Sequence, residues 1–299
     1  MSDILRGLAS RASLIAWTLP SAIAAGAFAL LVLPHIDHLP VFRDIASLDS
    51  VAQAGVLAFT VVALAFLLDA FSTPLYRVLE GYLGWPQWLQ NWRVTKQTAR
   101  KESIKTAIKS ASGWQQGLLY ERLSRFPDAD DQIVPTRLGN ALRAFETYAH
   151  NHFSLDSQSV WSELFASVPK SLQQEYESSR AGVDFFVAVF YLAALFGLIA
   201  FAVALTTGPL ILLVGAAISF ALLPIAYRLA YQNTSYWADT TRAVVNLGRK
   251  GLADNFGLVL PDSIQEERKM WQAVNAFIFY PYEKALAEAL DEFRGGSDH

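Results

Sequence analysis

A stretch of 43 residues, Phe185–Tyr227, contains no Asp, Glu, Lys or Arg. A single helix needs about 20 apolar residues to cross a bilayer, so this stretch is long enough for two. Its middle reads Thr-Thr-Gly-Pro, in which Gly favours the end of one helix and Pro the beginning of the next. The sequence therefore predicts a transmembrane hairpin made of Phe185–Leu205 and Pro209–Tyr227.

Two more apolar runs lie upstream, and together with the hairpin they predict four membrane spans. Ala12–Leu33 is longer than the apolar core of a signal peptide, which has about 7–15 residues, so we predict a retained first span. Ser50–Leu68 is the second run, and Gln53 and Thr60 make it the most polar of the four. Such polar groups either hydrogen-bond to neighbouring helices or line a water-filled path.

The remaining segments are polar and follow helical rather than alternating patterns, so the predicted fold class is all-α. We expect a polytopic membrane protein with four transmembrane helices and a helical cytoplasmic domain. Neither polar segment has an obvious core of its own, which predicts that the two fold together. The predicted divisions are residues 1–74 and 183–230 for the membrane pairs, and 75–182 and 231–299 for the cytoplasmic part.

Positive charge predicts the orientation of the spans, because Lys and Arg concentrate on the cytoplasmic side. The connection His35–Asp49 has one Arg, and the hairpin turn has none, whereas Arg93–Lys109 has six basic residues. We therefore expect a multi-pass protein of the bacterial inner membrane with both termini in the cytoplasm.

Aromatic residues cluster in two places. Tyr76–Trp92 carries Trp85, Trp88 and Trp92 at helical spacing, which is typical of a helix at the membrane–water interface, broken here near Pro86. An aromatic stripe in a protein core is the alternative. The second cluster is Phe277–Tyr282, and we expect it to pack against the Trp residues of the first cluster or against Trp161.

The densest basic segment is Arg93–Lys109, with a net charge of +5. Its helical spacing places Lys101, Lys105 and Lys109 on one face. Anionic lipid beside the bilayer is one partner for such a face, and plain solvation is a second interpretation. An anionic small molecule, such as a nucleotide, or an oligonucleotide is the more specific possibility.

A second candidate anion site follows Pro135. Thr136 can cap the helix that follows, and Arg137, Asn140 and Arg143 recur at three-residue intervals along it. Two Arg side chains with an amide could bind a phosphate or a carboxylate. The alternative is that they cap helices and connect elements of the soluble part.

The segment around these residues reads PTRLGNALRAFETYAHNHFSLDSQSVW, from Pro135 to Trp161. It resembles a box, PTRLGN…LRA.E.YA followed by VW..L, of an uncharacterised family of bacterial membrane proteins with four predicted spans. The resemblance covers less than a tenth of the chain. It implies no activity and assigns no functional residue.

Catalytic and metal-binding patterns are weak. The chain has no Cys, which excludes disulfides, thiolate metal sites and Cys nucleophiles. His35 and His38 lack a third ligand, and the Asp residues at 128, 130 and 131 lack the spacing of a calcium loop. We therefore predict no cofactor, no metal and no enzymatic activity.

Three functional classes remain to be weighed. The first is a homo-oligomeric channel or pore that senses an anionic ligand, and a bacterial anti-phage defence effector that depolarises the membrane would fit this plan. Its predicted pore-lining residues are Gln53, Thr60, Asp69 and Asp184, the last also a possible ion-pair partner of Arg228. The second is a membrane-anchored scaffold or assembly factor, which needs fewer assumptions. A membrane enzyme is the weakest of the three, because the sequence has no nucleophile–base set or phosphate loop.

Overall fold

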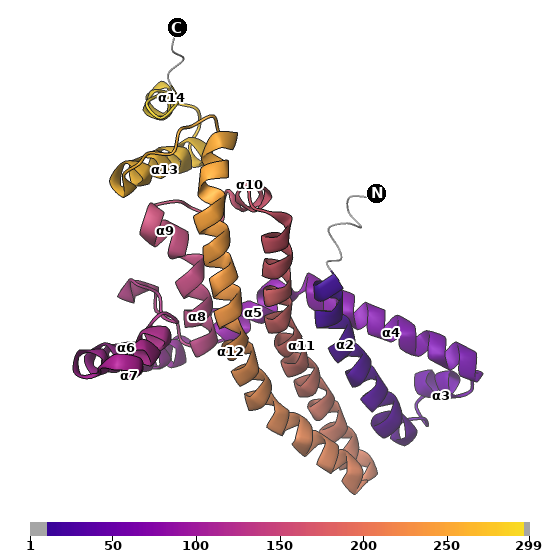
Figure 1. Cartoon of the computed structure of the whole chain (residues 1–299). Coiled ribbons are helices and arrows are strands. Elements are labelled where there is room, and N and C mark those ends of the chain that lie inside the picture. The colour runs from indigo at the N-terminus through magenta and orange to yellow at the C-terminus, as the bar shows by residue number, and fades with distance from the viewer. Residues whose placement is uncertain (1–10, 296–299) are drawn as a thin grey trace. The chain divides into compact units, whose positions relative to one another are not determined.

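A computed structural model of the chain describes residues 11–295, in which all regular secondary structure is helical and no strand occurs. The all-α prediction is therefore confirmed. The chain divides into two compact units: unit 1 comprises Met1–Gly84 and Glu177–Thr234, and unit 2 comprises Trp85–Tyr176 and Ser235–His299. The two longest helices, α11 (Lys170–Thr207) and α12 (Leu210–Asn255), contribute residues to both units (Figure 1).

Four helical segments of the described chain are long and apolar enough to cross a membrane, as the sequence predicts. The first, Ile15–His35, runs through α2 (Arg11–Ala27), a π-helical turn and a 3-10 turn. The second is α4 (Ser50–Ala70), and the other two lie within α11 and α12. By length and composition, the chain has the helices of a membrane protein.

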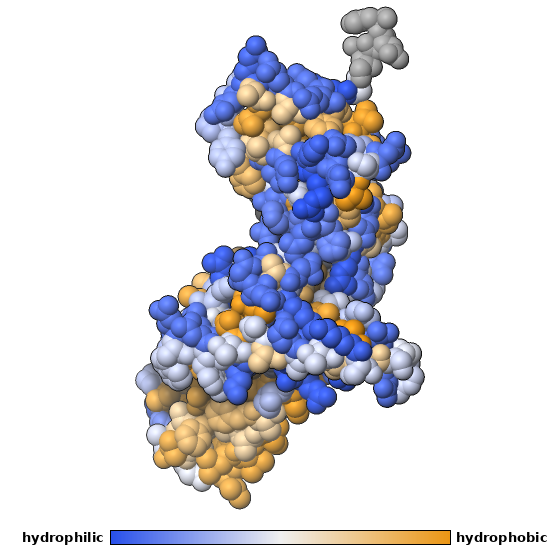
Figure 2. Space-filling view, turned by 90° about the vertical axis from the view of Figure 1, so that its left-hand side faces the viewer, coloured by the Kyte–Doolittle hydropathy of each residue, from blue (hydrophilic) through white to orange (hydrophobic). Residues whose placement is uncertain are grey.

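The turn of the hairpin forms where the sequence places it. Helix α11 ends at Thr207, and Gly208 adopts a φ of +84°, which a residue with a Cβ rarely adopts. The arms lie close at Gly197, where a Cβ would come within 3.1 Å of the Phe220 ring. Leu205, Leu210 and their neighbours expose apolar side chains around the turn, and Figure 2 shows this hydrophobic surface at its lower end.

Unit 1 packs the end of the first span against this hairpin. Val32 and Ile36 are buried against Ala200, Leu212 and Ala216. Helix α4 begins where the Asp49 carboxylate accepts a hydrogen bond of 2.8 Å from the Ala52 amide, and it packs along α2. The unit also contains η1 (Phe28–Val32), η2 (Leu33–His35), α3 (Pro40–Ala46) and α5 (Ser72–Glu80).

Unit 2 contains two apolar clusters. The smaller one joins α6 (Gln87–Ser110) to α7 (Gly113–Leu123) through Ile104, Ile108 and Phe126. The larger one surrounds Trp271, which is fully buried. The other helices of the unit are η3 (Asp130–Gln132), α8 (Arg137–Glu146), α9 (Tyr148–Phe153), α10 (Trp161–Ala166), α13 (Ile264–Phe279) and α14 (Lys284–Asp291).

Both aromatic clusters expose large side chains, and in the first Trp88 is 71% and Trp92 51% exposed. The predicted break near Pro86 is confirmed, because α5 ends at Glu80 and α6 begins at Gln87. Trp161 packs on Phe165 and Tyr176, with ring centroids 5.8 and 5.2 Å away. The packing predicted for the second cluster is wrong: its rings are exposed by 43–76%, in Phe277, Phe279, Tyr280 and Tyr282. Helix α13 buries Met270, Trp271 and Val274. By helical spacing Phe277 follows them on the same side at the end of the helix, and Phe279 lies on the opposite side.

Two helical glycines test the packing of unit 2. At Gly248 an added Cβ would lie 2.8 Å from the Leu164 side chain and 3.0 Å from its carbonyl oxygen. We expect Gly248→Ala to lower the free energy of unfolding by about 1–2 kcal/mol, because overpacking outweighs the gain in helix propensity. The measurement is thermal or denaturant unfolding of the purified protein.

Gly117→Ala is the matched control, because nothing lies within 4 Å of a Cβ at this exposed position of α7. This change should leave stability unchanged or raise it by up to about 1 kcal/mol. Equal effects of the two changes would contradict the close approach at Gly248.

Candidate functional site

The predicted anion-binding residues of α6 lie on different sides of the helix. Gln97, Lys101, Ile104 and Ile108 are buried, and their spacing of three and four places them on the face that packs toward α7 and the loop after it. Lys109 is exposed at the end of the helix, and Lys105 is half-buried. The three lysines therefore do not share one open surface.

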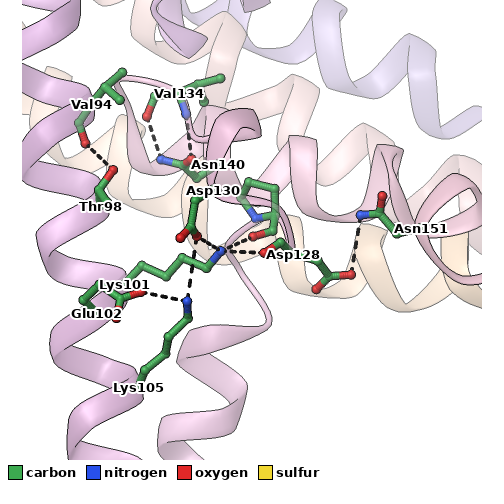
Figure 3. Close-up of polar contacts among 11 residues, drawn as sticks. Val94, Thr98, Lys101, Glu102, Lys105, Asp128, Asp130, Val134, Asn140 and Asn151 are labelled. Atoms are coloured by element: carbon green, nitrogen blue, oxygen red, sulfur yellow. Dashed lines mark hydrogen bonds and ion pairs between the residues drawn. The ribbon is translucent and has the colours of Figure 1, made fainter.

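The Lys101 ammonium holds the loop that follows α7. It donates hydrogen bonds to the carbonyl oxygens of Pro127 (2.7 Å) and Asp128 (2.8 Å) and to Oδ1 of Asp130 (2.6 Å). Figure 3 shows this side chain extending from α6 to the loop. An ammonium has three donors, and all three are used here. Lys101, a predicted ligand contact, thus lies with a side chain only 3% exposed and binds protein acceptors.

Lys105 belongs to the same network at its surface edge. Its ammonium lies 2.7 Å from Glu102 and 3.8 Å from Asp130 (Figure 3). The hydrogen bond to Glu102 raises the pKa of Lys105, and the hydrogen bond from Lys101 lowers the pKa of Asp130. Both shifts favour the charged forms that hold the loop to α6.

Asn140 is buried and closes the loop before α8. Its Nδ2 donates to the carbonyl oxygens of Val134 (2.8 Å) and Thr136 (2.7 Å), and its Oδ1 accepts from the Val134 amide (2.9 Å). Thr136 caps α8 by accepting from the Gly139 amide at 2.9 Å, as the sequence predicts. Asn140, also a predicted ligand contact, is 1% exposed, and its amide is engaged with backbone.

The two arginines of α8 differ in exposure. Arg137 is exposed, whereas Arg143 is half-buried. Burial raises the pKa of Glu146, and the charge of Arg143 opposes that shift. With Asn140 inside the unit, the three residues do not form the common binding face that their spacing predicts.

The four predicted pore-lining residues lie in unit 1 and differ in their burial and partners. Gln53 and Thr60 line one cavity, and Asp69 is exposed at the end of α4. Asp184 is buried and accepts a 2.6 Å hydrogen bond from the Tyr76 hydroxyl. Its ion-pair partner is Arg180, at 3.6 Å, rather than Arg228. These residues do not form a single path within one chain.

One buried polar network escapes the sequence analysis. Arg249 forms an ion pair with Glu267, and its guanidinium lies 3.5 Å from the centroid of the Phe153 ring. The same carboxylate accepts a 2.9 Å hydrogen bond from Trp271 Nε1. Of the contacts in this network, the sequence could predict only one, because Glu267 and Trp271 are one helical turn apart. The network joins α9, α12 and α13.

Metal chemistry has little support in the described residues, where no group of three His, Asp or Glu side chains is placed to hold an ion. His35 Nδ1 lies 3.1 Å from the Leu31 carbonyl oxygen, and Asp130 is engaged by Lys101. No family model, curated protein or solved structure matches this chain.

Substituting Lys101 separates the structural role from a ligand role. Lys101→Met leaves the Pro127 and Asp128 carbonyls without their donor, so we expect a loss of about 1–3 kcal/mol in the free energy of unfolding. Lys109→Met, two turns away on an exposed position, should change it by less than about 0.5 kcal/mol. Equal stability of both variants by denaturant unfolding would contradict the anchoring role.

The pair should also respond to acid. Because its pKa is lowered in the folded state, Asp130 stabilises the fold above its unfolded pKa of about 3.9, and this contribution is lost as the pH falls through the folded pKa. The stability difference between the wild type and Lys101→Met should therefore shrink between about pH 5 and pH 3. Unfolding midpoints across that range measure it, and a constant difference would contradict the pairing.

Proposed function

We propose that the protein is a membrane-anchored scaffold, in which four helices fix the chain in a bilayer and unit 2 recruits a soluble protein. The observation that carries the proposal is the exposure of Phe277, Phe279, Tyr280 and Tyr282 within six consecutive residues. Aromatic side chains supply much of the binding energy in protein interfaces. A cluster of them that does not enter a core is a suitable surface for a partner.

The base of this aromatic segment is held in place. Earlier in α13, Met270, Trp271 and Val274 are buried in the core of unit 2. Asn275 donates a 2.7 Å hydrogen bond to the Ser154 carbonyl and accepts one of 3.1 Å from the Asp156 amide. A partner would therefore meet rings on a fixed helix end, which reduces the entropy cost of binding.

The polar side chains predicted to bind a ligand or line a pore give less support to the alternative, a channel that senses an anionic ligand. Lys101 and Asn140, which would contact an anionic effector, are engaged with backbone inside unit 2. Asp184, a possible pore residue, is engaged by Tyr76. This use of the polar side chains favours the scaffold over the channel.

A photoreactive amino acid at Tyr280 tests the scaffold in living cells. We expect a discrete adduct with a soluble protein, and this adduct should be lost when Phe277 and Phe279 are both changed to Ala. The same probe at Trp114, which is 73% exposed on α7, should give no such adduct. Labelling of lipid alone at Tyr280 would contradict the proposal.

The orientation that we propose places unit 2 and both termini in the cytoplasm of a bacterial cell, as the distribution of positive charge predicts. Tags at Ser2 and Ser297, which lie outside the described residues, should be protected from a membrane-impermeant reagent in intact cells. Accessibility of either tag from outside would contradict this orientation.

A homo-oligomeric channel is the second candidate. Gln53 and Thr60 facing one cavity favour it, as do Arg137 and Lys109, which stay at the surface where an anionic effector could reach them. Particle mass in detergent and ion flux in liposomes distinguish the two functions. The scaffold predicts no flux, whereas a ring of subunits with flux that depends on Arg137 and Lys109 would establish the channel.

A further inference from the structure

A cavity of about 730 Å³ lies among the spans of unit 1, between the first span, α3, α4 and α11. Its volume falls within the range of about 300–1,000 Å³ found for small-molecule sites. Every residue that lines it belongs to unit 1. Two of them, Gln53 and Thr60, are the polar residues of the second span.

The walls of the cavity are mainly hydrocarbon and aromatic, with Phe28, Phe42 and Phe196 among the lining residues. Four lining side chains are polar, and none of the lining residues is basic: the polar ones are Asp37, Ser50, Gln53 and Thr60. Asp37 precedes α3 in the chain, and Ser50 and Gln53 lie in the first turn of α4, just after α3. These three residues therefore lie at the end of the cavity next to α3. A ligand with a net negative charge would find no cationic partner in this lining.

The donors of these polar groups are partly used within the fold. Gln53 Nε2 donates to the carbonyl oxygens of Ala46 and Leu48, both at 3.1 Å, and the Thr60 hydroxyl donates to Val56 at 2.8 Å. What remains for a ligand is chiefly acceptors, including the carboxylate of Asp37. A ligand that matches this end therefore carries hydrogen-bond donors, such as an ammonium or a hydroxyl.

The cavity is elongated along α4. Its lining on this helix extends from Ser50 to Leu64, which corresponds to about 21 Å of helix. That length and the apolar walls suit a single extended hydrocarbon chain.

The surrounding medium supplies such a chain. Helices α4 and α11 are both long and apolar enough to lie in a bilayer, where lipid tails are the solvent. We propose that the cavity binds one hydrocarbon chain of a membrane lipid, with an ammonium-bearing headgroup such as ethanolamine beside Asp37 and Gln53. A cavity filled in this way is a lipid site and not part of an ion path.

Two alanines one helical turn apart on α4 provide a matched test. Ala54 lines the cavity and Ala58 does not, and both are exposed. The full-length protein is reconstituted with phosphatidylethanolamine that carries a diazirine on one acyl chain, and the labelled peptides are mapped after irradiation. In the wild type we expect labelling to concentrate on the cavity-lining positions of α4, the first span and α11.

Ala54→Trp should reduce this labelling by about tenfold, and Ala58→Trp should leave it unchanged. Even labelling along all lipid-facing helices, or equal labelling of the two variants, would overturn the proposal. Ala29→Phe fills the cavity from the first span and should act like Ala54→Trp, which keeps the test valid if one variant does not fold.

The headgroup is tested with the same diazirine chain on phosphatidylglycerol. We expect phosphatidylethanolamine to label the cavity more strongly, and Asp37→Asn to reduce that preference. The two lipids differ in the ammonium group, so equal labelling would overturn the assignment of an ammonium-bearing headgroup. None of these results depends on the adduct at Tyr280, so the lipid site and the scaffold can fail independently.

Discussion

The constraint behind the four apolar helices is the absence of water in a bilayer, which each of them is long and apolar enough to cross. In hydrocarbon every backbone N–H and C=O must find a partner within the protein, and a helix is the form in which one segment does so alone. The uncharged stretch Phe185–Tyr227 therefore has to form a helical hairpin. Both arms continue beyond it, and residues such as Leu172, Val244 and Leu252 then enter the core of unit 2. Formation of that core thus depends on the same two helices that provide the hairpin.

The features that the sequence predicts correctly are those with a local cause. Four apolar runs mark the spans, because length and hydrophobicity are properties of each segment by itself. The turn at Gly208, the break near Pro86 and the cap at Thr136 follow from the backbone preferences of single residues. None of these predictions required knowledge of which segments meet.

The features that escape prediction depend on contacts between distant segments. Lys101 and its acceptors are separated by 26–29 residues, and two of them are backbone carbonyls, which every residue possesses. The partner of Asp184, Tyr76, lies 108 residues away. A high density of aromatic residues likewise does not tell whether they are buried. Phe277–Tyr282 and Trp161 look alike in the sequence, but in the structure Trp161 packs on other rings and Phe277–Tyr282 are exposed. For the candidate site, the sequence identifies charged residues but not whether they face solvent.

The anchor at Lys101 also bears on how this region can evolve. Two of its three acceptors are main-chain oxygens, which remain in place whatever side chains positions 127 and 128 carry. Homologous chains can therefore accumulate substitutions in this loop while the lysine itself is retained. Purifying selection at that one position, beside drift in the loop it contacts, would be the signature of a residue kept for folding and not for recognition.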